Sequence, residues 1–351
     1  MVYSMFKQKE MISSVEILHV DSSGGVRKII DKNGNRYTEV KQTTDLQTKV
    51  CIFECTKKVS QHCLGKIGFN VETGRAMMIN FHSCRWSYDE ASGYCYDRYG
   101  VNENIKTGYH PPVQTWVEKW NLLWSIHSET GNIWSHGIGV VISLYFLWNT
   151  LFNTDFCNDL VMVFAECVNV ALFLHSTMYH WLHICSKSWN KNLECLDYCG
   201  TANKLFAGHM TWMYYALGPH SFLFGGYLII QIIILLATLV VSYNITFSTK
   251  TDFKRSETIR IGLYLAQQGL IYLLILHQIS LNQTPKFFAC FYVISFLSCY
   301  AIGMVSYATK FPEVLWPGKF DTYFNSHQIM HVMILIATIL ERHAWSCIRN
   351  Y

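Results

Sequence analysis

The chain has 351 residues, of which 51% are hydrophobic and only 15% are charged, and soluble globular proteins are rarely this apolar. The formal net charge is +4, with no basic domain and no aromatic–basic groove, so the composition argues against a nucleic-acid partner. The first ten residues hold no apolar run after their basic residues, and we therefore expect no cleaved signal peptide.

Residues 1–108 are polar and mixed in composition, and no chemical motif stands out in them. Asn33-Gly34 separates two apolar segments, residues 26–30 and 37–40, which is a sequence signal for a β-hairpin. Glu72-Thr73-Gly74 is a second candidate turn. We expect this region to be cytosolic, and to be either a small β-rich module or partly disordered.

The chain has 13 cysteines, many of which lie in apolar segments where cysteine behaves as a small hydrophobic residue. One group invites comparison with a zinc site: Cys51, Cys55, His62, Cys63 and Cys84. Its spacing matches no standard ligand pattern, so we favour reduced or structural cysteines over a second metal site.

Residues 113–127 have the pattern of an amphipathic helix. Val113, Trp116, Val117, Trp120 and Leu123 recur at helical spacing, and Glu118, Lys119 and Asn121 lie off that stripe. Such a helix lies on the membrane surface, and an apolar segment long enough to cross the membrane follows at once. We therefore assign residues 109–130 to an amphipathic juxtamembrane helix.

Seven apolar segments follow, each close to the roughly 20 residues that a membrane-spanning helix needs. The fold class predicted for residues 131–351 is therefore an all-α membrane protein with seven transmembrane helices. The segments lie near residues 133–152, 160–184, 196–217, 222–243, 259–281, 287–307 and 326–345.

The loops between these segments alternate in charge, which predicts their orientation. The second–third, fourth–fifth and sixth–seventh connections hold eight basic residues, and the other three connections hold only Lys286. Positive charge collects on the cytosolic side, so the N-terminus is predicted inside and the C-terminus outside. The eight basic residues are Lys187, Lys191, Lys250, Lys254, Arg255, Arg260, Lys310 and Lys319.

The seventh segment begins with two histidines four residues apart, His327 and His331. This spacing puts both imidazoles on one helix face, where two nitrogens can bind one metal ion. In the predicted topology, Ser176 and His180 end the second segment and Asp197 stands in the first turn of the third. All five side chains then share one level of the membrane near the cytosolic face, where polar groups are costly and suggest function.

Three neutral imidazoles suit Zn²⁺ in a tetrahedral site with one position open for water, and they predict His180, His327 and His331 as ligands. Zinc lowers the pKa of such a water to about 7. Asp197 is then either a general base or a direct fourth ligand, which would make the site closed and structural. Ser176 is a nearby hydroxyl that orients or polarises. Gln328 occupies the place of the usual zincin glutamate.

Several other histidines are candidates for ordinary packing. We favour His180 over its neighbour His183 because His180 pairs with Ser176 at helical spacing. His136, near the start of the first segment, is predicted to pack or hydrogen-bond, and His209 and His277 to be satisfied core residues.

With these residues identified, the chain resembles the progestin and adipoQ receptor family, and within it the adiponectin receptors. The similarity covers about residues 85–345. The matching stretches are Gly108-Tyr109-His110-Pro111-Pro112, Ile126-His127-Ser128-Glu129-Thr130-Gly131-Asn132-Ile133-Trp134-Ser135-His136, Ser176-Thr177-Met178-Tyr179-His180, Leu196-Asp197-Tyr198, Pro317-Gly318-Lys319-Phe320-Asp321 and Ser326-His327-Gln328-Ile329-Met330-His331.

The resemblance implies seven helices, an internal N-terminus and a zinc ion on three histidines, which map onto His180, His327 and His331. The family's serine and aspartate map onto Ser176 and Asp197. The resemblance also implies a plasma-membrane receptor that controls lipid and fatty-acid metabolism, with a lipid in its helical cavity, an extracellular protein ligand and a ceramide-hydrolysing activity.

The third segment departs from the family pattern. Asn203 and Lys204 stand where adiponectin receptors are apolar, and no proline precedes Trp212. Lys204 lies two turns after Asp197 and is a candidate partner for Asp197 or for Glu166. Two functions stay open: a signalling receptor, and a zinc-dependent membrane lipid amidase (a ceramidase) without a protein ligand. A proton or ion channel is disfavoured because the spans lack rings of charge.

Overall fold

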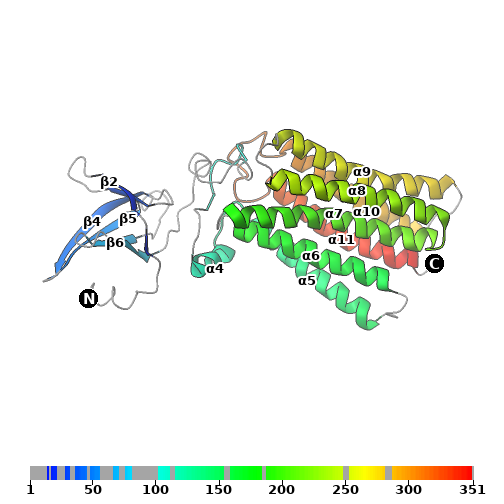
Figure 1. Cartoon of the computed structure of the whole chain (residues 1–351), viewed down its shortest axis with the longest axis horizontal. Helices are drawn as coiled ribbons and strands as arrows, with labels where there is room; N and C mark the ends of the chain where they lie inside the picture. The colour runs from blue at the N-terminus through cyan, green and yellow to red at the C-terminus, as the bar shows by residue number, and fades with distance from the viewer. Residues whose placement is uncertain are drawn as a thin grey trace. The chain divides into compact units, whose positions relative to one another are not determined.

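The computed structural model describes residues 102–110, 115–153, 159–183, 187–247, 253–280 and 287–349, together with the backbone of seven strands between residues 14 and 80. The chain divides into two compact units, Met1–Ser128 and Glu129–Tyr351 (Figure 1). The cysteine and histidine group around Cys51 lies outside the residues whose side chains are described.

The first unit contains one seven-stranded antiparallel sheet, in the part of the chain for which a small β-rich module was one of the two expectations. Both predicted hairpins are present: β3 pairs with β4 across Asn33-Gly34, and β6 pairs with β7 across Glu72-Thr73-Gly74. The strands are β1 (Ser14–Val15), β2 (Ile17–Asp21), β3 (Lys28–Asp31), β4 (Arg36–Asp45), β5 (Thr48–Cys55), β6 (Lys66–Asn70) and β7 (Ala76–Asn80), in the order β1-β7-β6-β5-β4-β3-β2.

Strands β1 and β2 stand at opposite ends of this order, although a single residue, Glu16, separates them in the chain. β1 pairs with β7 and β2 pairs with β3. Residues two apart in an extended chain are separated by only about 7 Å. The two edge strands of the sheet, β1 and β2, are therefore close together where Val15 and Ile17 follow each other closely in the chain.

The first unit also contains α4 (Trp116–Trp124), shorter than the predicted helix. It starts at Trp116 because Thr115 forms a capping box with Glu118: the Thr115 hydroxyl accepts from the Glu118 N–H, and the Glu118 carboxylate accepts from the Thr115 N–H. Trp116, Trp120 and Trp124 are exposed and Leu122 is buried, so the helix is amphipathic. Val113 lies outside the described residues.

The second unit is a bundle of seven long helices that run side by side (Figure 1). Each predicted apolar segment is a helix. The helices are α5 (Thr130–Asn153), α6 (Leu160–Leu182), α7 (Lys187–Leu217), α8 (Phe222–Phe247), α9 (Phe253–Ser280), α10 (Phe287–Thr309) and α11 (Ser326–Arg349). α7 and α9 begin earlier than predicted, because polar first turns precede their apolar parts.

Five of these helices are long and apolar enough to cross a membrane: α5, α6, α8, α9 and α10. The chain is therefore a multi-pass membrane protein. Its outer surface fits this environment, since Ile229, Ile233, Leu236 and Val240 of α8 are exposed. α7 and α11 fall short of the same criterion. They are long enough, at 31 and 24 residues, but both carry charged side chains within the bundle.

The packing of the helices places α11 against three others of the bundle. Helices next to each other in sequence pack together from α5 through α9, and α11 packs on α10, α5 and α7. The ends of α6 and α11 away from the histidines meet a buried apolar cluster that includes Met162, Trp212, Phe296 and Trp345.

One of the eight basic residues used to predict the orientation, Arg260, is buried in the structure. Arg260 is the eighth residue of α9, and only 3% of its surface is exposed. Its guanidinium stacks on the Tyr198 ring at 3.5 Å. Arg260 is thus an internal residue, and it does not count toward the positive charge of the loops.

Candidate metal centre

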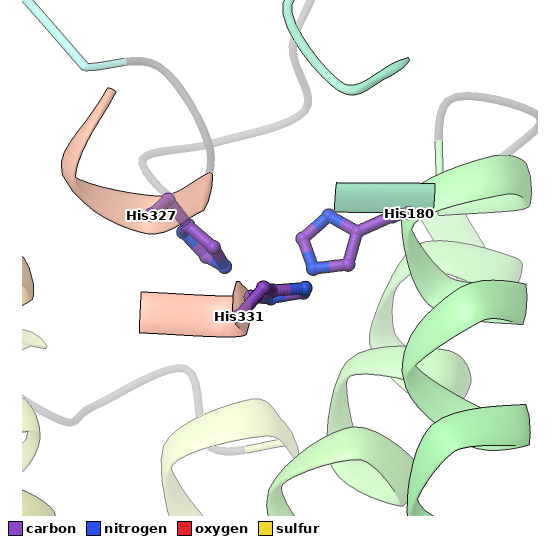
Figure 2. A group of neighbouring side chains, drawn as sticks. All are labelled: His180, His327 and His331. Atoms are coloured by element: carbon purple, nitrogen blue, oxygen red, sulfur yellow. The ribbon is translucent and has the colours of Figure 1, made fainter. Parts of the chain in front are cut away.

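The structure brings His180 of α6 together with His327 and His331 of α11. One ring nitrogen from each histidine lies within 4.8 Å of the other two. The ring centroids are 4.9 Å apart for His180–His327, 4.7 Å for His180–His331 and 4.8 Å for His327–His331. Figure 2 shows the three rings converging on one point between the helices.

The environment of these rings fits a bound cation. His180 and His331 are buried, and His327 is partly buried. Nε2 of His180 and Nδ1 of His331 have no hydrogen-bond partner among the described residues. Buried polar atoms are normally paired, so two unpaired imidazole nitrogens in one cluster fit the donor atoms of a metal site. Three imidazoles are a donor set that suits Zn²⁺.

Glu129 orients the first of these histidines. Nδ1 of His180 donates to Oε2 of Glu129 at 2.7 Å, and the same oxygen accepts from Asn132 Nδ2 at 2.7 Å. Burial by itself would raise the pKa of Glu129, but the hydrogen bond with His180 and the nearby His183 and His327 lower that pKa below its usual value. An ionised Glu129 fixes the His180 tautomer that presents Nε2 to a metal.

Sequence reasoning gave no role to Glu129. A signal was available, because this acidic residue immediately precedes α5, at the membrane level assigned to the histidines. Its partner is 51 positions away in the chain, however, and only the packing of α5 on α6 reveals the contact.

We expect Glu129→Gln to weaken zinc binding by roughly 10- to 100-fold, since loss of an outer-shell carboxylate commonly has that effect. Glutamine keeps the size of the side chain but lacks the charge that polarises His180. Competition with a chromophoric chelator measures the change. Glu103→Gln removes an exposed carboxylate and is the matched control, with no expected change.

Ser176 and Asp197 also lie at this centre. The Asp197 carboxylate interacts with the Ser176 hydroxyl, and it is close enough to His180 and Arg260 to feel their charges. Among the described residues, Asp197 is not in the group of mutually close metal-binding atoms, which favours a role beside the metal over a place as fourth ligand. The prediction that Asp197 lies in the first turn of its helix is wrong, because α7 starts at Lys187 and Asp197 follows ten residues later. The dipole at the N-terminus of α7 therefore does not act on the Asp197 carboxylate.

Neither predicted partner of Lys204 is correct. Lys204 forms an ion pair with Glu341 of α11, and Glu166 pairs instead with Arg342, at 2.9 Å between Oε1 and Nε. The carboxylate of Asp197 is thus not tied to Lys204.

The remaining histidines lie outside the group of three. His136 packs as predicted, with its ring stacked on His331 at 3.7 Å between centroids. His183 Nδ1 contacts the Tyr179 carbonyl at 3.2 Å, and His209 hydrogen-bonds Gln231 at 3.0 Å.

Gln328 belongs to the scaffold of the centre. Its Nε2 donates to the Thr322 carbonyl and its Oε1 accepts from the Phe324 N–H, both at 2.8 Å. The side chain fills the space beside Gly131, where an added Cβ would collide with it. Gln328 therefore joins the start of α11 to the preceding loop by hydrogen bonds and packs against α5.

Comparison with known proteins places this centre in a family. The family model described as haemolysin-III related matches residues 124–341, which include all three histidines and most of the helical bundle. The chain belongs to the haemolysin-III related family. The resemblance to progestin and adipoQ receptors is confirmed by similarity to several members of this group.

Three relatives illustrate the similarity. The progestin and adipoQ receptor-like protein 1 of Caenorhabditis elegans is 28% identical over 247 residues, which is 68% of this chain and 56% of that protein. The adiponectin receptor protein of Drosophila melanogaster is 26% identical over 259 residues, 71% of this chain and 57% of that protein. The membrane progestin receptor alpha of Mus musculus is 24% identical over 258 residues, with 68% and 71% covered. The chain thus spans little more than half the length of the first two relatives.

Proposed function

We propose that this haemolysin-III related protein is an adiponectin-receptor-like membrane receptor with an intramembrane Zn²⁺ centre that regulates lipid and fatty-acid metabolism. The observation that carries the proposal is the cluster of His180, His327 and His331, with two orphan ring nitrogens and an oriented His180. Receptor names among the relatives support the signalling role. The proposed partners are a lipid held between the helices and an extracellular protein ligand, and the proposed location is the plasma membrane.

The second candidate is a ceramidase-type hydrolysis of a lipid amide at the same centre. His180, His327 and His331 would hold the zinc ion, which when bound would supply a water of pKa about 7 and polarise a carbonyl oxygen. Asp197 would accept a proton as general base, a role supported by its carboxylate's interaction with Ser176 and its absence from the group of mutually close metal-binding atoms among the described residues. Ser176 holds that carboxylate in place, and Glu129 keeps His180 in the required tautomer.

The receptor and amidase functions are separated by two assays. Fatty-acid release from ceramide by the purified protein, abolished by a zinc chelator, supports the amidase. Ligand-dependent signalling by a variant that lacks the histidines supports a receptor without hydrolysis.

We further propose that all seven helices cross the membrane, with the N-terminus in the cytosol. α7 and α11 fit this arrangement because their central charges pair inside the bundle, as Lys204 does with Glu341, and are kept away from lipid. The remaining seven basic residues of the orientation argument, against Lys286 alone, favour the cytosolic N-terminus.

Epitope tags test this orientation. We expect an N-terminal tag to be inaccessible to antibody in intact cells, and a tag after Tyr351 to be accessible. Asn244, in the sequon Asn244-Ile245-Thr246, should carry no glycan, because it lies at the cytosolic end of α8 in this topology. A glycan at Asn244 would reverse the assignment.

A further inference from the structure

α6 and α11 face each other through long side chains. Among the described helices, α6 packs closely on α5 and α7, while α11 packs on α5, α7 and α10. α6 and α11 therefore share neighbours without forming an extensive contact of their own. What joins them directly is the histidine group at one end and two ion pairs farther along.

The two ion pairs form a ladder between these helices. Arg342 Nε lies 2.9 Å from Glu166 Oε1, and Arg349 Nη2 lies 2.6 Å from Asp159 Oδ2. Both acidic side chains are fully buried. Asp159 is the N-cap residue of α6 and Glu166 lies seven residues farther along, and the two arginines are seven apart on α11. Seven residues make about two helical turns, so each helix presents its charges on one face.

The ladder has a defined register. In each ion pair the two residue numbers add up to 508, as expected for antiparallel helices with the same rise per residue. In that register the position opposite His180 is 328, which lies between His327 and His331. The alignment that satisfies both ion pairs is thus the one that brings the three imidazoles together.

A third ion pair extends this arrangement to α7. Lys204 pairs with Glu341, the neighbour of Arg342, and Tyr300 of α10 also donates to Glu341 at 3.4 Å. Gly208, one turn after Lys204, leaves the space that the Glu341 carboxylate occupies, since a Cβ there would collide with it.

Apolar contacts alone specify such a register poorly. Inside a membrane, the side chains of α11 meet apolar groups whether they face another helix or lipid, so sliding along the helix costs little. A slip by one turn moves α11 by about 5.4 Å and would separate Glu166 from Arg342 and Asp159 from Arg349. Unpaired charges at this depth are strongly unfavourable, and single buried polar contacts are known to set helix register.

We propose that the ion pairs Glu166–Arg342 and Asp159–Arg349, supported by Lys204–Glu341, set the register of α11 against α6 and thereby position the metal ligands. These charged side chains are positioning residues for a centre whose nearest ligand on α6 is 14 residues, or about 21 Å, from Glu166. The inference rests on the proposed zinc centre for its functional meaning.

The test is a charge exchange in the full-length protein, purified in lipid nanodiscs. We expect Glu166→Arg and Arg342→Glu, each alone, to weaken zinc binding by at least about tenfold with all three histidines intact. The double variant Glu166→Arg/Arg342→Glu should return to within about threefold of the original affinity, because it restores the pair in reverse. Lys319→Glu reverses an exposed charge and is the control, with no expected change.

Photo-cross-linking measures the register of α11 against α6 and does not depend on zinc. Benzoylphenylalanine is placed at Leu335, which shares the helix face of His331 and Arg342. In the alignment of α6 and α11 that both ion pairs satisfy, position 335 lies opposite Phe173. We expect cross-links near Phe173 in the original protein and in the double variant, displaced by three or four residues in each single variant. If a single variant does not fold, Glu166→Gln/Arg342→Gln, which removes both charges, should show the same displacement.

The outcomes are separable. Original protein that binds no zinc would overturn the metal centre, while the cross-links would still decide whether the ladder sets the register. Folded single or Gln/Gln variants with unchanged zinc affinity and unchanged cross-links would overturn the ladder and leave the metal centre standing.

Discussion

Purified protein is expected to contain about one zinc ion per chain, and His327→Ala/His331→Ala is expected to contain none. The double substitution leaves His180 as the only ligand of the group of three, and one imidazole does not retain Zn²⁺ through dialysis against a chelator. Stability should fall as well, because metal binding favours the folded state by about 4 kcal/mol when free zinc is a thousand times its Kd. Elemental analysis and thermal unfolding measure the two effects.

The control for this experiment removes two imidazoles that lie outside the group of three. His183→Ala/His343→Ala takes away one ring near the Tyr179 carbonyl and one stacked on Tyr292, and it should keep its zinc. Stoichiometric zinc in a folded His327→Ala/His331→Ala protein would contradict the assignment of the ligands.

Asp197→Asn is expected to retain zinc and to lose ceramide hydrolysis by roughly 100-fold or more, the usual consequence of losing a general base. Asparagine keeps the shape of the side chain and its contact with the Ser176 hydroxyl, but it does not accept a proton. Because Lys204 pairs with Glu341 and not with Asp197, the substitution does not leave Lys204 without its partner. Zinc content and the rate of fatty-acid release from the same preparation give the answer.

Two results would change this mechanism. Equal hydrolysis by the original protein and by zinc-loaded Asp197→Asn would remove Asp197 from it. No hydrolysis of any lipid amide by the original protein would leave the receptor function alone. Thr201→Ala is a suitable control, since the Thr201 hydroxyl donates to the backbone carbonyl of Asp197 and not to its carboxylate, and its loss should not slow hydrolysis.

The sequence by itself determined the seven helices and the level of the histidines. Apolar length is a local property, so each helix appears where the segments predicted it. The alternation of loop charge and the four-residue spacing of His327 and His331 are local as well. Together they predict that His180, Ser176 and Asp197 share the membrane depth of that pair, and the structure brings the three histidines together and sets Asp197 near Ser176 and His180.

The tertiary structure alone decided which side chains meet at a given depth. Sequence periodicity fixes the height of a residue on its helix, but not the rotation of one helix relative to the next. Glu129 meets His180 only because α5 packs on α6. Lys204 lies 137 positions from Glu341, and both Asp197 and Glu166 were nearer alternatives that the rotation of α7 excludes. The register of the ion pairs depends on the same rotation, because a buried charge takes whichever partner the packed helices bring within reach.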